Sequence, residues 1–435
     1  MNNPAEVREY LFDLQKRTLP NLVPRELKVA KSKKIVSVIG PRRAGKTYFM
    51  YQKMKELMDL GVRRENILYL NFEDPRLVGT SFKEIREIIK MHWQLSPSSA
   101  EGEFYVFLDE PQNVNGWELS ARALHDEGFN VFLTGSSSKL LSKEIATSLR
   151  GRTIAYRLLP FSFREFLRAR ALSLDAGRLG SKEKSVLLGA LDEYLDFGGF
   201  PEVFYESDKE TKTRIISEYF NLVVYRDIVE RHGIKNTQLI KWLIKSLAAS
   251  FSKEFSIHKI YLTLKSQGLR VSKNTLYAYV SMLEDSLFAF LVPKFNYSAR
   301  ERGFSIAKAY LCDVGFAKIS AVSKDVGRKM ENVVFLELER RRAPLSEISY
   351  WKNPQQEEVD FVVRTAGGVE QLIQVCRDVA DADARKRETR ALLKAGKELK
   401  CKNLLVISEN YEAEQRADGR KIKFVPLWKW LMARG

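Results

Sequence analysis

A glycine-containing loop between an apolar run and an amphipathic segment constrains this chain more than any other feature of its sequence. Residues 40–47 read Gly-Pro-Arg-Arg-Ala-Gly-Lys-Thr, which is the pattern G-x-x-x-x-G-K-T. Ile35–Ile39 before the loop is short enough to be one buried strand, and apolar residues recur at helical spacing after it. Glycines let successive N–H groups face a phosphate, and the helix start adds unpaired donors and partial positive charge.

The loop therefore predicts a nucleotide site, with ATP and Mg²⁺ as cofactors. Lys46 is expected to reach the β- and γ-phosphates, and the Thr47 hydroxyl is expected to ligate Mg²⁺. The residues expected to surround the nucleotide are Gly40, Pro41, Arg42, Arg43, Ala44, Gly45, Lys46, Thr47 and Tyr48.

Two carboxylates follow a second apolar run. Residues 104–108 predict a buried strand, and Asp109 and Glu110 come directly after it. Ligands of open α/β sheets gather at the carboxyl ends of the strands. Asp109 is therefore expected to hold Mg²⁺ beside Thr47, and Glu110 is expected to polarise an attacking water. This pair favours nucleotide hydrolysis over binding alone.

Strands and helices alternate through the first third of the chain. Further strands are expected at residues 67–72, 130–134 and 154–158, and helices at residues 81–93 and 117–127. Such alternation predicts an α/β fold with a parallel, doubly wound sheet.

The polar loop after residues 130–134 is expected to lie beside the Asp109 strand. A hydroxyl there can hydrogen-bond the attacking water or the γ-phosphate. Ser136 is our choice, with Thr134 and Ser137 as neighbours, and an ordinary loop with local side-chain-to-backbone bonds is the alternative.

Two arginines precede the last strand of this region. Arg150 or Arg152 could stabilise charge on the transferring phosphoryl group, in cis or from a neighbouring subunit, and we favour Arg152. A role in trans would require a homo-oligomer. A solvated surface arginine fits the sequence equally well.

Composition limits the classes of protein that fit. The 435 residues predict two to four domains, and a hydrophobic fraction of 45% with a charged fraction of 29% is globular. The net charge of +17 indicates an anionic partner, with nucleic acid as the first candidate. Three scattered cysteines argue against disulfides or zinc. Without an apolar leader or a run of ~20 apolar residues, we expect a cytoplasmic protein that does not contact a membrane.

Several motifs together carry a family resemblance. Residues 159–166 (Leu-Pro-Phe-Ser-Phe-Arg-Glu-Phe), 109–112 (Asp-Glu-Pro-Gln) and 133–138 (Leu-Thr-Gly-Ser-Ser-Ser), combined with the glycine loop, resemble the AAA-type P-loop ATPases of archaea and bacteria. In that family an ATPase module is fused to a C-terminal nuclease-like region. The resemblance implies a helical lid after the core, through about Gly233, and residues 194–202 fit that lid.

The chain changes character near Lys235. Residues 235–310 contain 12 Lys or Arg against 4 Asp or Glu. Three expected helices followed by a β-ribbon resemble a winged helix-turn-helix, whose third helix would enter a DNA groove with Lys273, Asn274 and Tyr277. The alternative is a winged helix used only for protein packing.

The last region is again α/β and resembles the PD-(D/E)xK nuclease fold. The resemblance implies a Mg²⁺ site, and Glu331 and Asp360 fall on its first two positions. Gln374 and Cys376 replace a metal-binding carboxylate and a lysine, so metal affinity and general-base function should both fall. We therefore expect a degenerate, DNA-binding or structural domain without nuclease activity. An ordinary α/β scaffold fits nearly as well.

These observations predict three domains: residues 1–234 as AAA-type core and lid, 235–312 as winged helix, and 313–435 as nuclease-like domain. The main hypothesis is ATP hydrolysis coupled to DNA binding. By analogy alone, the DNA would be branched, such as Holliday junctions in repair or recombination. An ATP-switched signalling or regulatory protein and an ATP-dependent nuclease are the alternatives.

Overall fold

The computed structural model describes residues 4–136, 149, 151–175, 177–320, 324–379 and 382–433. The chain forms two compact units. The first comprises Met1–Leu158 with Asp285–Leu287, and the second comprises Leu159–Glu284 with Phe288–Gly435. Each unit is described by itself.

A five-stranded parallel sheet is the centre of the first unit, as the sequence predicts. Its strand order is β2-β3-β4-β1-β5, and every pairing is parallel. The strands are β1 (Ile35–Ile39), β2 (Ile67–Asn71), β3 (Tyr105–Asp109), β4 (Asn130–Gly135) and β5 (Thr153–Arg157). Because β1 lies between β4 and β5, the loop that follows it leaves the middle of the sheet edge where ligands collect.

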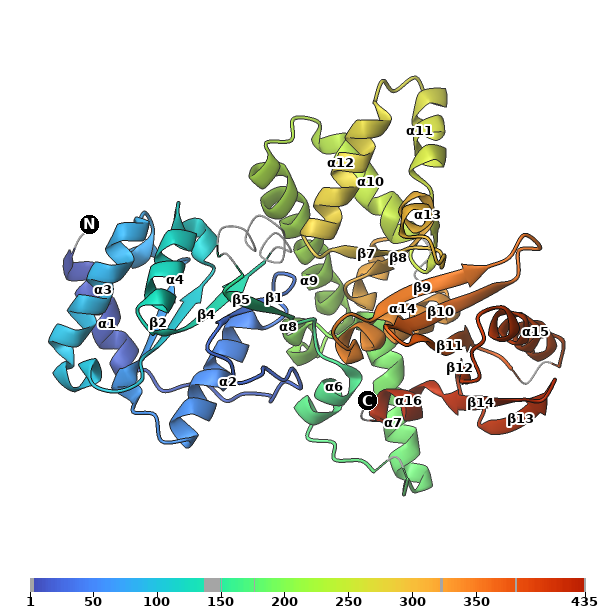
Figure 1. Ribbon diagram of the computed structural model, residues 1–435, viewed down its shortest axis with the longest axis horizontal. Helices are drawn as coiled ribbons and strands as arrows, with labels where there is room; N and C mark the ends of the chain where they lie inside the picture. Colours follow the sequence, from blue (N-terminus) through green and yellow to red (C-terminus); the bar gives the residue numbers. More distant parts are fainter. Residues whose placement is uncertain are drawn as a thin grey trace. The chain divides into compact units, whose positions relative to one another are not determined.

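In the described part of this unit, four α-helices flank the sheet. They are α1 (Pro4–Lys16), α2 (Lys46–Asp59), α3 (Phe82–Leu95) and α4 (Trp117–Asp126). Helix α3 packs against both α1 and α4, and Figure 1 draws α3 and α4 on one side of the strands and α2 on the other. Ser81 and Glu84 form a capping box at the start of α3. The predicted apolar face of this helix is buried through Ile85, Ile88 and Ile89.

The second unit begins with a helical segment. It contains α6 (Phe163–Ala169), α7 (Ser181–Phe197), α8 (Pro201–Tyr205), α9 (Lys209–Leu222) and a π-helix at Val223–Glu230. These are the helices predicted to form a lid on the nucleotide-binding core. Their contacts group them with the second unit, and the change of unit comes at Leu158. The three-domain division stays a prediction.

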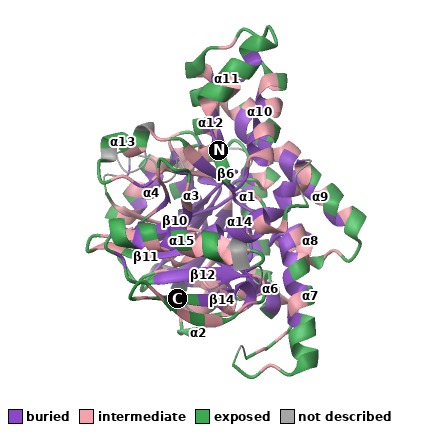
Figure 2. Ribbon diagram, turned by 90° about the vertical axis from the view of Figure 1, so that its right-hand side faces the viewer, coloured by how far each residue is buried: buried purple, intermediate pink, exposed green. Residues whose placement is uncertain are grey.

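Four helices and a small antiparallel sheet follow. In chain order they are α10 (Thr237–Ala249), β6 (Lys253–Phe255), α11 (Ile257–Ser266), α12 (Lys273–Asp285), β7 (Ala289–Val292), α13 (Ala299–Phe304) and β8 (Ala307–Leu311). The sheet has the order β6-β8-β7. The predicted ribbon is confirmed by the antiparallel pairing of β7 with β8. Figure 2 shows α11 as mostly exposed, and its one buried residue is Leu264.

The C-terminal part contains a six-stranded mixed sheet of order β13-β14-β12-β11-β10-β9. Its elements are α14 (Val326–Arg341), β9 (Glu347–Lys352), β10 (Glu358–Thr365), β11 (Gly368–Cys376), α15 (Ala382–Glu398), β12 (Leu404–Ser408), β13 (Ala413–Ala417), β14 (Arg420–Pro426) and α16 (Leu427–Met432). Strand β12 is buried throughout, as Figure 2 shows. The β13–β14 hairpin is absent from the sequence prediction, because its alternating charged residues resemble a solvated loop.

A buried carboxylate joins three parts of the second unit. The side chain of Glu337, on α14, is 1% exposed. It lies 3.0 Å from Arg164 of α6, 3.5 Å from Arg340 and 2.8 Å from Arg341. Arg164 and Arg341 both also donate to the carbonyl oxygen of Ala433, just after α16. The arginine–glutamate cluster therefore connects α6, α14 and the end of α16.

Candidate functional site

The glycine loop leaves β1 and enters α2 at the carboxyl edge of the parallel sheet. The Gly40 N–H donates to the carbonyl oxygen of Gly135, at the end of β4. A Cβ on Gly40 would lie 2.1 Å from the carbonyl oxygen of Leu158, so only glycine fits there. Gly45 has a φ of 92°, in the left-handed region that glycine adopts without strain. Glycine is thus required at position 40 for lack of space and favoured at position 45 by the backbone conformation.

Lys46 is folded back over the loop and is buried. Its Nζ lies 3.2 Å from the carbonyl oxygen of Gly40 and 3.3 Å from that of Pro41. It also lies 3.2 Å from Oε1 of Glu110. The ammonium is therefore surrounded by oxygen atoms that a phosphate oxygen could replace.

Asp109 is the most heavily bonded carboxylate of the site. Its Oδ2 accepts a 2.7 Å hydrogen bond from Thr47 and a 2.6 Å bond from the Tyr69 hydroxyl of β2. Its Oδ1 accepts from the Thr134 hydroxyl of β4. Burial raises the pKa of Asp109, although the hydrogen bonds that it accepts act in the opposite direction. Three neighbouring elements thus fix the carboxylate beside Thr47.

Glu110 stands on a left-handed backbone, with a φ of 52°. Its N–H donates to the Thr134 hydroxyl over 2.9 Å, and its Oε2 accepts from the side chain of Gln112. Burial by itself raises the pKa of Glu110, but attraction by the Lys46 ammonium outweighs it and the pKa is lowered. The carboxylate is therefore charged at neutral pH.

The polar loop after β4 begins with a buried serine. Ser136 is fully buried, and its hydroxyl has no hydrogen-bond partner among the described residues. Thr134, by contrast, is occupied by Asp109 and by the Glu110 N–H. Ser137 lies outside the described residues. Of the three hydroxyls considered from the sequence, Ser136 is the one that has no hydrogen-bond partner in the described part of this loop.

Arg152 lies at the wrong edge of the sheet for the predicted role in cis. Thr153 pairs with Ile35 at the start of β1, whereas the glycine loop follows the end of β1. A five-residue strand at about 3.3 Å per residue separates the two edges by roughly 16 Å. The Arg152 guanidinium instead lies 2.7 Å from Asp126. A role in a neighbouring copy remains a prediction, and Arg150 lies outside the described residues.

Arg25, which no sequence motif marks, holds the glycine loop from outside. It is buried, and its Nη1 donates to the carbonyl oxygen of Ala44 over 2.8 Å. Its backbone N–H donates over 2.8 Å to Gln52 of α2. The segment before β1 therefore fixes both the loop and the helix that follows it.

Replacing Arg25 with methionine is expected to weaken nucleotide binding about tenfold, because a charge-assisted hydrogen bond to the loop is lost. Titration with a fluorescent ATP analogue measures this affinity. Lys28→Met is the matched control, since Lys28 is exposed in the same segment and the change removes the same charge. Equal affinities of the two variants would contradict a role for Arg25 in shaping the loop.

These residues fit a nucleotide with its metal ion. Thr47 and Asp109 offer two oxygen ligands 2.7 Å apart, the hard donors that Mg²⁺ prefers. Lys46 offers the cation. Arg42 lies at the loop with its guanidinium 3.4 Å from Glu73, and the Tyr48 side chain is exposed.

The residues predicted to contact DNA share the exposed face of α12. Lys273, Asn274 and Tyr277 are all exposed, and Tyr277 is 56% exposed. The Lys273 ammonium lies 5.2 Å from the ring centre of Tyr261 on α11. Leu276, Val280 and Leu283 form the buried face of the same helix.

The nuclease-like positions are only partly brought together. Glu331 and Asp360 both accept hydrogen bonds from Lys308 of β8. The Gln374 amide oxygen accepts from the Asp360 N–H over 3.3 Å. Cys376 donates instead to the carbonyl oxygen of Asp378, and burial raises the pKa of its thiol to about 11. The thiol therefore cannot take the place of a lysine cation.

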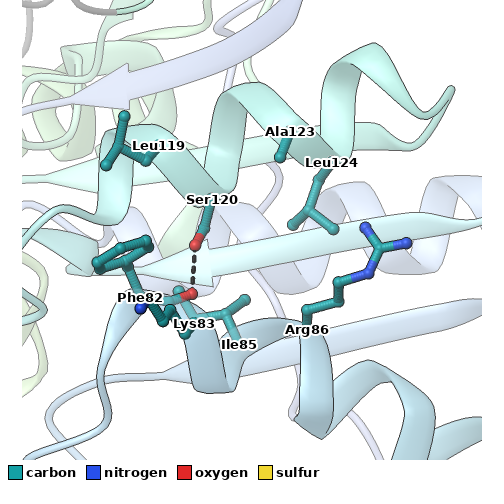
Figure 3. A pocket seen from close by; sticks show the side chains of 8 residues that line it. All are labelled: Phe82, Lys83, Ile85, Arg86, Leu119, Ser120, Ala123 and Leu124. Carbon is teal, nitrogen blue, oxygen red and sulfur yellow. Dashed lines mark hydrogen bonds between the residues drawn. The ribbon is translucent and has the colours of Figure 1, made fainter.

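A separate hollow of about 400 Å³ lies between α3 and α4. Figure 3 shows its apolar lining and the Ser120 hydroxyl bonded to the Phe82 carbonyl oxygen. Its lining residues are Phe82, Lys83, Ile85, Arg86, Leu119, Ser120, Ala123 and Leu124, none of which belongs to the site above. Among the described residues, no helix is both long and apolar enough to cross a membrane.

Comparison with protein families divides the chain into three matched segments. Residues 32–167 match the AAA domain. Residues 188–325 match a domain of unknown function, DUF8612, and residues 326–430 match another, DUF4143. The first match contains the glycine loop, both carboxylates and Ser136.

Two curated proteins resemble almost the whole chain. Uncharacterized protein MJ1544 of Methanocaldococcus jannaschii is 38% identical over 415 residues, which are 94% of this chain and 89% of that protein. An uncharacterized protein of Haemophilus influenzae is 32% identical over 401 residues, 91% of this chain and 93% of its own. The crystal structure of Cdc6p from Pyrobaculum aerophilum covers 67% of this chain and 87% of its own at 12% identity, with a TM-score of 0.27, a likeness too weak to support an inference.

Proposed function

Because the chain belongs to the same family as these archaeal and bacterial proteins, with an AAA domain followed by two domains of unknown function, we propose that it is an ATPase whose hydrolysis is coupled to DNA binding. The observation that carries the ATPase proposal is the meeting of Lys46 and Thr47 with Asp109 and Glu110 at one edge of the sheet.

Each of these four side chains has a separate role in ATP hydrolysis. Lys46 releases Glu110 and the loop carbonyls to bind the β- and γ-phosphates, while Thr47 and Asp109 hold the metal ion. Glu110, charged and freed from Lys46, orients the attacking water. When bound, Mg²⁺ supplies charge neutralisation for the phosphate oxygens. The Ser136 hydroxyl is available to bond the water or the γ-phosphate.

Charge and topology support the DNA-binding half of the proposal. The net charge is +17, which favours an anionic partner. From α10 to β8 the order is helix, strand, helix, helix, strand, short helix, strand, which supports a winged helix with α13 inserted between its last two strands. Its third helix, α12, exposes Lys273, Asn274 and Tyr277, the residue types that meet phosphates and bases.

The preference for branched DNA rests on analogy alone, through the resemblance of the C-terminal sequence to the PD-(D/E)xK nuclease fold. In this proposal the protein acts on repair or recombination intermediates such as Holliday junctions. The nuclease-like domain binds DNA or has a structural role, and it does not cut DNA.

DNA is expected to raise the ATPase rate, and four-way or forked DNA more than linear duplex or single strands. Lys273→Ala should weaken binding to all sequences alike and reduce the salt slope of log affinity by about 1. ATPase rates with the four DNA forms at one fixed salt concentration, and affinities over a salt series, measure these effects.

Lys182→Ala is the matched control, because Lys182 is an exposed lysine on α7, outside the three-helix module. Turnover that responds to none of the DNA forms would contradict coupling. Slow single-turnover hydrolysis with ATP-dependent assembly would then favour the regulatory switch.

A further inference from the structure

Lys308 is a buried lysine surrounded by three carboxylates. Its Nζ lies 2.9 Å from Glu331 Oε1, 2.9 Å from Asp360 Oδ1 and 2.6 Å from Glu358 Oε1. An ammonium has three N–H donors, so each carboxylate can accept one of them. We call Lys308 and these three carboxylates the Lys308 cluster.

The cluster is closed to large ligands. The exposed fraction of the side chain is 3% for Lys308, 7% for Asp360 and 12% for Glu331, and only Glu358, at 28%, reaches the surface. A phosphodiester must touch a catalytic metal and its carboxylates, so a site for cutting DNA has to be open. Burying these charges is tolerable only because each one is paired.

The chain itself uses the remaining acceptor positions. The Tyr310 hydroxyl donates to Glu331 Oε1 over 2.7 Å, and the Val375 N–H donates to Asp360 Oδ2 over 2.9 Å. Within the described ranges, no three His, Cys, Asp or Glu side chains are spaced to hold a metal ion. The carboxylates are arranged around the ammonium instead.

We propose that the Lys308 ammonium takes the place of a divalent cation in the C-terminal domain, so that the Lys308 cluster is a filled structural site and not a nuclease centre. The cluster supplies the same hard oxygen donors that Mg²⁺ or Ca²⁺ would use, and the lysine neutralises them permanently. It also ties β8 to α14 and β10. This inference does not depend on ATP hydrolysis.

The first test counts bound Mn²⁺ without nucleotide by electron paramagnetic resonance. Thr47→Ala is present in every sample, so that the nucleotide site adds no ion. The protein with native Asp360 and its Asp360→Asn variant are expected to bind equally few Mn²⁺ ions and to show equal, background cleavage of DNA. Mn²⁺ binding or cleavage that Asp360→Asn removes would overturn the proposal and make Lys308 an auxiliary of a working metal site.

The second test removes the internal cation. Lys308→Met leaves the carboxylates without their cation and free to draw together around an ion, so it is expected to gain one Mn²⁺ site, which Asp360→Asn added to it abolishes. Lys352→Met is the matched control, because Lys352 lies 3.6 Å from the same Glu358 but outside the cluster, and it should gain none. A folded Lys308→Met protein without a new Mn²⁺ site would refute the proposal. The first test does not use Lys308→Met, so its result is valid even if that variant fails to fold.

Discussion

Replacing Lys46 with alanine is expected to lower ATP turnover by at least about 10²–10³-fold, the scale of losing one charged group aimed at a reacting centre. Lys46 is the one cation that lies both against the loop carbonyls and against Glu110 in the described site. Without it, the β- and γ-phosphates lose the charge that the lysine of the loop is expected to supply. Steady-state phosphate release measures the loss.

Lys53→Ala is the matched control, because Lys53 lies on the same helix and pairs with Glu56 at its surface. The Lys53→Ala variant should hydrolyse ATP at the rate of the unchanged protein. Lys46→Ala should stay on a DNA column as firmly as the unchanged protein, since the proposed DNA contacts lie in the other unit. Normal hydrolysis by Lys46→Ala would exclude the glycine loop as the site of catalysis.

Replacing Glu337 with alanine is expected to destabilise the second unit by about 3–5 kcal/mol, because it leaves three partly buried arginines without their buried carboxylate. Arg164, Arg340 and Arg341 all lose a partner at once. Hydrogen exchange followed by mass spectrometry resolves the effect by segment, which matters since a chain of two units need not unfold in one step. Protection should fall in α14 and α16.

Glu210→Ala is the control for this change. Glu210 pairs with Arg214 on the surface of α9, with both side chains about three-quarters exposed. Its loss should shift stability by no more than about 0.5 kcal/mol. Unchanged protection of α14 and α16 in Glu337→Ala would mean that the arginine–glutamate cluster does not hold these helices together.

The parallel core could be predicted from the sequence because each of its strands is a short apolar run, and these runs alternate along the chain with segments of helical periodicity. The glycine loop and Asp109 could be placed for the same reason, since both follow such a run. Residues that follow a strand lie at the carboxyl edge of the sheet, whereas Arg152 precedes β5 and therefore lies at the opposite edge, away from the glycine loop. Strand direction decides which end of a run can reach a ligand.

Arg25 and Lys308 could not be predicted because their partners are distant in sequence and no local pattern joins them. Lys308 meets Asp360 across 52 residues and from a different sheet. In the sequence it is one lysine among many in a basic region. Burial and pairing appear only when the strands are assembled.

The backbone of Leu158 contacts the start of the glycine loop. Its N–H donates to the Ile39 carbonyl oxygen over 2.7 Å, and its own carbonyl occupies the space beside Gly40. The backbone passes from the first unit to the second directly after this residue. The peptide that leads out of the first unit is therefore packed against the first glycine of the loop, so that a single backbone contact sets both the shape of the loop and the path by which the chain leaves this unit.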